Sequence, residues 1–246
     1  MLNQKWFRIL VFYLIALISS IVLRIDSPEW FNQFHLPYGL SIYKEWLGGL
    51  GPFFGALFVT RIFNVERTIS FFGTSKAKSI LMAIIPVVLF TIVGASTSEV
   101  NNHFYGFHLG VMLVIYGLLE ETGWRGYLQD ELRGIHPVIK YVLIGFLWYA
   151  WHLTFIGNIL HLKSELSILF ILILASWGIG QAAEYTQSII VSGCLHIIGN
   201  IMAFSSLILQ GIDLNGRLTI AGISVFAFVL MLVVWEKSYF MSWNRK

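Results

Sequence analysis

Two adjacent carboxylates, Glu120 and Glu121, follow an apolar run from Val111 to Leu119. A charged side chain near the centre of a bilayer costs roughly 2.5–3.5 kcal/mol on insertion scales, so packing alone does not explain a pair of glutamates there. On a helix, Glu121 and Arg125 are four residues apart and can form an ion pair. Glu120 then points in another direction and needs a partner from elsewhere in the chain.

Three further polar side chains lie inside apolar runs and are candidate partners of Glu120. His152 follows Trp148 by four residues, and His196 and Asn200 share the same spacing in a later run, which places each pair on one helix face. A glutamate beside a histidine can act as a general base, and histidine with asparagine can donate hydrogen bonds to a developing oxyanion. Polar side chains also hold membrane helices together, at about 0.6 kcal/mol per hydrogen bond, but this set together favours catalysis.

The composition indicates the surroundings in which these residues work. Of the 246 residues, 57% are hydrophobic and 12% are charged, whereas a soluble domain carries about 25% charged residues. The chain is therefore predicted to be a multi-pass integral membrane protein with the lipid bilayer as a partner. Loop lysines explain the formal net charge of +3 better than a nucleic-acid partner does. The single cysteine, Cys194, excludes a disulfide framework and a cysteine metal cluster.

Eight apolar runs are candidate membrane helices, since about 20 apolar residues cross a bilayer. They predict an all-α, polytopic fold in which residues 1–246 form a single integral membrane domain. The runs are Trp6 to Leu23, Leu47 to Phe63, Ile80 to Ala95, Gly106 to Glu120, Val138 to Ile156, Leu166 to Ala183, Ser188 to Leu209, and Leu218 to Trp235. Gly51 and Gly55 form a GxxxG pair that could let another helix approach, but this spacing is common by chance and we favour no special contact.

The fourth run is expected to continue as a helix beyond Glu120. Trp124 and Tyr127 keep the helical spacing of apolar residues, and the stop signals come only at Gly134 to Pro137. A helix from Gly106 to Arg133 would be roughly 40 Å long. Glu120 then lies about midway along it rather than at an end.

The candidate site residues are also expected at similar depths in the bilayer. Counted from the cytoplasmic ends of their predicted helices, His152, His196 and Asn200 lie about 21, 12 and 18 Å deep, and Glu120 lies about 20 Å from the opposite end of its helix. The hydrocarbon core is about 30 Å thick. Four polar groups on three helices can therefore meet within the bundle.

The distribution of positive charge predicts the orientation of the chain. Lys5 and Arg8 stand before an apolar stretch, as in a signal peptide, but no small-residue cleavage site follows, so the first run is expected to be retained. Eight spans put both termini on one side. With Arg125 set aside as intramembrane, eleven of the 16 Lys and Arg fall on the side of the termini and four on the other. The positive-inside rule then places both termini in the cytoplasm.

The candidate residues form three motifs on separate apolar runs. They are Glu-Glu-x-x-x-Arg at 120–125, Trp-x-x-x-His at 148–152 and His-x-x-x-Asn at 196–200. In this order they resemble the CAAX protease and bacteriocin-processing (CPBP, Abi-type) family of intramembrane proteases, to which the type II CAAX prenyl endopeptidase (Ras-converting enzyme) belongs. The second motif usually begins with phenylalanine, and Trp148 stands in that place. By this resemblance Glu121 and Arg125 support the site, as does Trp148.

The resemblance implies an eight-helix fold and peptide-bond hydrolysis without a covalent intermediate. In that mechanism Glu120 and His152 activate water, while His196 and Asn200 stabilise the oxyanion. The expected substrate is a peptide or membrane protein, with a prenylated or a precursor peptide among the candidates. A prokaryotic plasma membrane is the expected location.

Other interpretations of the same residues remain open at this level. Glu120, His152 and His196 could bind zinc, because two histidines and one glutamate form a known catalytic ligand set. We favour metal-free chemistry without a cofactor, on the strength of the family resemblance. A non-enzymatic protein of the same fold, such as a bacteriocin-immunity or scaffold protein, is an alternative. A proton-coupled transporter is another, although no inverted repeat of hydropathy is visible.

Overall fold

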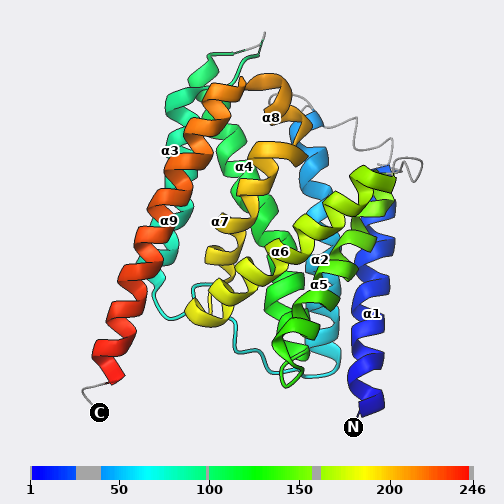
Figure 1. The fold of residues 1–246 in the computed structure, drawn as a ribbon. Helices are drawn as coiled ribbons and strands as arrows, with labels where there is room; N and C mark the ends of the chain where they lie inside the picture. Colours follow the sequence, from blue (N-terminus) through cyan, green and yellow to red (C-terminus); the bar gives the residue numbers. More distant parts are fainter. Residues whose placement is uncertain (1, 26–39, 98–99, 157–161, 244–246) are drawn as a thin grey trace.

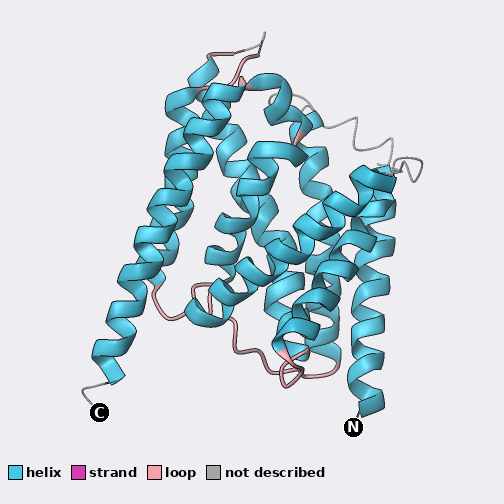
Figure 2. Cartoon of the chain, in the orientation of Figure 1, coloured by secondary structure: helices cyan, strands magenta, loops and turns pink. Residues whose placement is uncertain are grey.

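The structure, a computed structural model, describes residues 2–25, 40–97, 100–156 and 162–243. These residues form helices joined by turns and loops, with a single parallel bridge between Ser70 and Ser188 and no longer strand (Figure 2). The α-helices are α1 (Leu2–Ser20), α2 (Leu40–Ile62), α3 (Lys76–Val93), α4 (Asn102–Gly123), α5 (Pro137–Ile156), α6 (Leu162–Thr186), α7 (Ile189–Gly199), α8 (Ser206–Gly211) and α9 (Leu214–Trp243). The π-helical segments Ile21–Ile25, Trp124–Gln129 and Asn200–Phe204 continue α1, α4 and α7. The predicted all-α class is confirmed for this part of the chain.

Helices α4 and α7 occupy the middle of the bundle. In Figure 1, α3 and α9 lie side by side at one edge, α1 lies at the other edge beside α2, and α6 crosses in front next to α5. The start of α1 and the end of α9 lie at the same end of the bundle. This placement agrees with an even number of crossings.

The outer surface of the bundle is apolar. Judged by length and composition, five helical stretches of the described residues can cross a membrane, namely Gln4–Leu23, Lys76–Val93, Asn102–Gln129, Leu166–Thr186 and Leu214–Trp235, and two shorter apolar helices are Leu47–Ile62 and Ile189–Phe204. Large hydrophobic side chains are exposed along their outer faces, such as Phe7, Leu10, Leu14 and Ile18 of α1. Soluble monomers rarely expose apolar patches of this extent. The chain is therefore a polytopic membrane protein, while the count of eight spans stays a prediction.

The long helix that carries the glutamates begins at a defined cap. The side chain of Asn101 accepts hydrogen bonds from the backbone N–H groups of His103 and Phe104, which satisfies donors that an uncapped helix would leave free. Helical structure then runs without interruption to Glu131, through the π-helical turn Trp124–Gln129. The expectation that this helix passes well beyond Glu120 is confirmed.

The GxxxG pair of α2 does make close helix contacts, so our preference for no special contact was wrong. A Cβ atom at Gly51 would overlap the side chain of Ser20 in α1, and one at Gly55 would lie 2.7 Å from the carbonyl oxygen of Phe12. Real Cβ contacts are never this short. Glycine is required at both positions because α1 and α2 approach backbone to backbone.

The predicted single helix from Ser188 to Leu209 is interrupted, which corrects the sequence-based expectation. Ser188 caps the start of α7 by accepting from the N–H of Val191, and the helix ends in the π-helical segment Asn200–Phe204. Ser205 has an extended backbone (φ −93°, ψ 113°), and its side chain accepts from the N–H of Ile208 at the start of α8. Serine stabilises such a break because its hydroxyl group replaces a helical backbone acceptor.

Candidate active site

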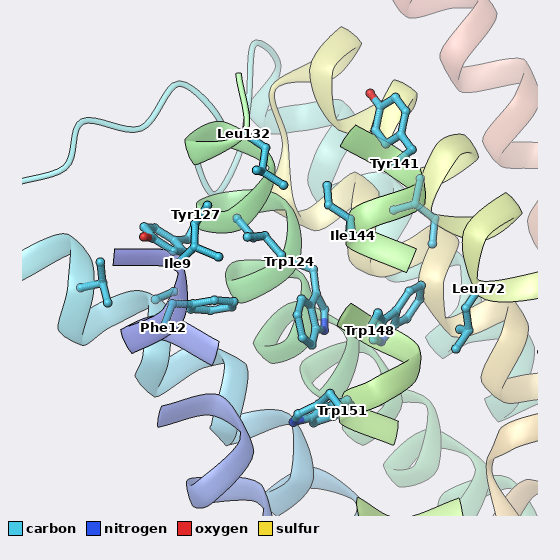
Figure 3. Packing of buried hydrophobic residues seen from close by; sticks show 14 residues of the cluster. Ile9, Phe12, Trp124, Tyr127, Leu132, Tyr141, Ile144, Trp148, Trp151 and Leu172 are labelled. Atoms are coloured by element: carbon cyan, nitrogen blue, oxygen red, sulfur yellow. The ribbon is translucent and has the colours of Figure 1, made fainter. Parts of the chain in front are cut away.

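A buried aromatic cluster surrounds the region where the sequence motifs meet. Figure 3 shows Trp124 from the turn after α4 beside Trp148 and Trp151 of α5, with Phe12 of α1 on the side of Trp124 away from Trp148. Trp124 and Trp151 are fully buried, and their ring centroids lie 5.7 Å apart in an edge-to-face arrangement. This packing fixes α5 against the carboxylate-bearing end of α4.

The two glutamates occupy the last turn of α4, directly before the π-helical turn Trp124–Gln129. The side chains of Glu120, Glu121 and Arg125 are all completely buried. A Cβ atom on Gly123 would lie 2.5 Å from Cβ of Pro52, so α2 closes tightly over this turn. π-Helical turns inside α-helices are frequent at functional sites.

Glu121 binds two partners through one oxygen. Its Oε1 accepts from Nη1 of Arg125 at 2.9 Å and from Nδ1 of His196 at 2.7 Å. The ion pair expected from the spacing of Glu121 and Arg125 is therefore present. The hydrogen bond to His196 was not expected, and it fixes the orientation of a ring that comes from α7. Because Nδ1 of His196 faces the carboxylate of Glu121, the other ring nitrogen, Nε2, points away from that carboxylate.

Glu120 points to a different set of groups. Its Oε2 accepts from the indole Nε1–H of Trp148 at 3.1 Å and lies 3.9 Å from Nε2 of His196. Its Oε1 is buried and has no hydrogen-bond partner among the described residues. Buried carboxylate oxygens are normally hydrogen-bonded. Oε2 of Glu121 is likewise buried without a partner among the described residues, so each glutamate keeps one such oxygen.

His152 lies one helical turn after Trp148 in α5. Its Nδ1–H donates to the backbone carbonyl oxygen of Trp148 at 2.8 Å. The two rings are in contact, with centroids 5.7 Å apart. A neutral imidazole that donates from Nδ1 carries its lone pair on Nε2, which makes Nε2 a possible proton acceptor.

Asn200 stands at the junction of α7 and the following π-helical segment. It is 7% exposed, and its amide nitrogen Nδ2 has no partner among the described residues. This side chain lines a small pocket of about 70 Å³ together with Trp148, His152 and His196. The other walls are apolar and come from α6, α7 and the π-helical segment, namely Ile171, Leu172, Ala175, Ile179, Leu195, Gly199 and Phe204.

The structure therefore brings the seven candidate residues into one cluster. His152, His196, Asn200 and Trp148 line the pocket directly, whereas Glu120 reaches it through its contacts with Trp148 and His196. Sequence reasoning missed the wall contributed by α6, because its apolar residues carry no chemical signal. It also missed the close approach of α4 and α7, where a Cβ on Gly117 would lie 2.9 Å from the carbonyl oxygen of Gly193.

The zinc alternative requires three donors around one point. Within the described part of the chain, no three His, Cys, Asp or Glu side chains gather closely enough to hold a metal ion. Glu120, His152 and His196 thus do not form the ligand set that the sequence left open. Metal dependence itself stays a prediction that chemical analysis must test.

Comparison with known proteins points to the class that the motifs suggested. Residues 102–202, from the start of α4 into the π-helical segment after α7, match the family model described as type II CAAX prenyl endopeptidase Rce1-like. The resemblance to the CPBP family is thereby confirmed, since this match includes all three motifs.

A curated relative carries the same class name. It is CAAX prenyl protease 2 of Methanococcus maripaludis, 31% identical over 114 residues, and the match covers 41% of this chain and 41% of the relative. No solved structure matches the chain. These comparisons support a peptidase of the CAAX-protease type, and they do not identify its substrate or its catalytic residues.

Proposed function

We propose that the chain is an intramembrane endopeptidase that hydrolyses a peptide bond with water activated by Glu120 and His152. The observation that carries this proposal is the unpartnered Oε1 of the buried Glu120 carboxylate. It belongs to a cluster whose histidines and asparagine line an enclosed pocket. An acceptor of this kind, held away from bulk solvent, suits the removal of a proton from water.

The first step is attack by water on the carbonyl carbon of the substrate. Oε1 of Glu120 takes a proton from the water while Nε2 of His152 accepts a hydrogen bond from the same molecule. A carbon–oxygen bond forms, and the electrons of the carbonyl π bond move to its oxygen. Nδ1–H of His152 is already bound to the carbonyl of Trp148, which fixes the imidazole tautomer that this step requires.

The negative oxygen that develops needs hydrogen-bond donors inside the membrane. Asn200 offers its unpartnered Nδ2–H groups, and His196 offers Nε2–H when its ring is doubly protonated. Glu120, Glu121 and Arg125 alone carry one excess negative charge, so a protonated His196 makes the buried cluster neutral. Preorganised donors of this kind contribute about 2.7–4 kcal/mol each to transition-state stabilisation.

Collapse of the tetrahedral intermediate completes the hydrolysis. The carbon–nitrogen bond breaks, and the leaving amine takes the proton that Glu120 received from water. One water molecule is consumed, and a carboxylic acid and an amine are formed. Neither a covalent acyl-enzyme nor a cofactor is needed for this balance.

The lining of the pocket indicates which kind of substrate side chain it suits. Its walls beyond the polar residues are apolar, including Leu172 and Ala175 of α6, so they suit an apolar side chain beside the scissile bond. The substrate we propose is a peptide or membrane protein that reaches the site at the membrane, with a prenylated tail or a precursor peptide as the first classes to test. The family model and the relative are both named for prenylated CAAX substrates.

The Glu120→Gln variant tests this proposal. Glutamine keeps the size of the side chain but cannot take a proton from water, so cleavage should fall by about 10²–10⁴. Cleavage of prenylated and unprenylated test peptides is measured in detergent, and peptides are compared in membranes with and without the active protein. Glu184→Gln is the matched control, because Glu184 pairs with Lys140 at the surface of α6 and should leave cleavage unchanged.

Other outcomes would select the alternative functions. A cellular phenotype that persists in Glu120→Gln would favour a scaffold or immunity role without turnover. Loss of proton-coupled uptake in the same variant, with no peptide cleaved by the wild type, would favour a transporter.

A further inference from the structure

We infer that Trp148 is a positioning residue for Glu120, acting through its indole N–H. This inference rests on the proposed function and deepens it. Nε1 of Trp148 donates to Oε2 of Glu120 at 3.1 Å, between two side chains that are 3% and 0% exposed. A hydrogen bond to a charged group in such surroundings is stronger than one between neutral groups.

The indole is itself held in place on several sides. The guanidinium carbon of Arg125 lies 4.8 Å from the centroid of the Trp148 ring, in a cation–π contact that is strengthened by the absence of solvent. The ring centroids of His196 and His152 lie 5.0 and 5.7 Å away. Trp148 therefore cannot turn without disturbing both histidines, and its N–H has a fixed direction.

This bond decides which oxygen of Glu120 is available for chemistry. With Oε2 bound to Trp148, the carboxylate is oriented so that Oε1 is the unpartnered acceptor. Phenylalanine at this position would offer a similar ring but no donor. The tryptophan of this chain thus adds a group that stabilises the ionised carboxylate and fixes its rotation.

The pH dependence of such a site reflects every titratable group around Glu120. Those groups are Glu121 and Arg125 next to it, Tyr116 one turn before it on α4, His152 on α5 and His196 on α7. The described part of α2 brings Gly49 and Pro52 to this end of α4, and neither titrates. Replacing Trp148 changes no charge, so a changed pH profile reports the lost donor.

The first experiment compares Trp148→Phe with Trp235→Phe. Trp235 is a close match, because it is also 3% exposed, donates from Nε1 to Thr74 at 2.8 Å and lies under the cation of Lys78. It lies on α9, outside the site. Steady-state cleavage is measured across pH for both variants, with thermal unfolding in detergent as a check on folding.

Trp148→Phe should lower kcat by about 10- to 100-fold, the effect of one hydrogen bond to a charged group, with little change in KM. Without the donor, the Glu120 carboxylate loses the group that fixes its rotation, so the pH profile of kcat should change. Trp235→Phe should leave the profile in place. An unchanged pH profile in a folded Trp148→Phe variant would overturn the inference.

A second measurement does not depend on turnover. The wild-type protein labelled with ¹⁵N-tryptophan gives an indole N–H signal for Trp148, assigned by its absence from Trp148→Phe or Trp148→Tyr. Its chemical shift should differ between the wild type and Glu120→Gln, because glutamine removes the charged acceptor of the indole N–H. Equal chemical shifts in the two proteins contradict the inference. Different chemical shifts in a protein that cleaves no peptide refute the proposed function instead.

Discussion

At the residue scale, the two neighbouring glutamates have different hydrogen-bond partners. Glu121 gives one oxygen to Arg125 and His196, so its charge is largely used to hold the cluster together. Glu120 receives the indole of Trp148 and keeps a second oxygen unpartnered. Adjacent positions on a helix point about 100° apart, which is why one sequence motif can serve two purposes.

Glu121→Gln should therefore affect stability more than Glu120→Gln does. The substitution leaves the guanidinium of Arg125 buried without its ion-pair partner, and breaking a buried pair in this way costs roughly 3–5 kcal/mol. Thermal unfolding in detergent, with peptide cleavage measured in parallel, should show a lower melting temperature and a lower yield for Glu121→Gln. Glu120→Gln should unfold at or above the wild-type temperature, since it removes a buried charge.

The opposite pattern would reverse the roles of the two residues. If Glu120→Gln cleaves normally while Glu121→Gln is folded and inactive, Glu121 is the base and Glu120 supports the structure.

The members of the buried polar cluster were accessible from the sequence, whereas most of their hydrogen bonds, apart from the pair between Glu121 and Arg125, were not. Charged and polar side chains inside apolar runs are costly, so Glu120, His152, His196 and Asn200 stand out by type and position. The sequence does not show how α7 is rotated about its axis. This rotation allows Nδ1 of His196 to form a hydrogen bond with Glu121. The role of each residue in catalysis stays a prediction until variants are measured.

At the element scale, helix positions were predictable and helix separations were not. Each of the eight apolar runs coincides with helical structure in the described residues, and the seventh run holds the short helices α7 and α8 with the π-helical segment between them. Breaks such as the one at Ser205 depend on local hydrogen bonds of a single hydroxyl group, which an apolar run conceals. Contacts through small residues, as at Gly51 and Gly117, also carry only a weak sequence signal.

Gly117→Ala tests the importance of the contact between α4 and α7. The added methyl group would lie 2.9 Å from the carbonyl oxygen of Gly193, and overpacking of this kind typically costs about 1–3 kcal/mol. Because these helices carry Glu120 and His196, thermal stability and cleavage should both fall. Gly178→Ala of α6 is the matched control: a Cβ there meets no atom within 4 Å, so it should be neutral or stabilising. Equal melting temperatures for the two variants would show that α4 and α7 can separate without cost.

At the scale of the whole molecule, the bundle places a polar cluster among apolar helices. In the described residues, no set of three His, Cys, Asp or Glu side chains is gathered to bind a metal ion. We predict that purified, active protein contains no stoichiometric zinc, since its carboxylates are bound by Arg125, Trp148 and His196. Elemental analysis of the active fraction checks this expectation. One zinc per chain, lost in parallel with activity on chelation, would contradict it, whereas inhibition by a chelator alone would not.

Several loops and helix ends lie at the same end of the bundle. Lys5 donates to the carbonyl oxygen of Arg133 at 3.4 Å, Thr68 binds Asp130, and Lys78 donates to the carbonyl oxygen of Val234 at 3.4 Å. The start of α1, the loop before α3, the end of the α4 helix and the later part of α9 therefore share one side of the bundle (Figure 1).

That side carries most of the positive charge in the sequence, and we predict that it faces the cytoplasm. Reporter fusions after Arg133 and Lys246 should give the cytoplasmic signal, whereas a fusion at Lys163, at the start of α6, should give the opposite one. Equal signals at Lys163 and Lys246 would remove the eight-span topology. Inverted signals at all three positions would keep the spans and reverse the orientation, and the end of the bundle that bears Arg133 would then face away from the cytoplasm.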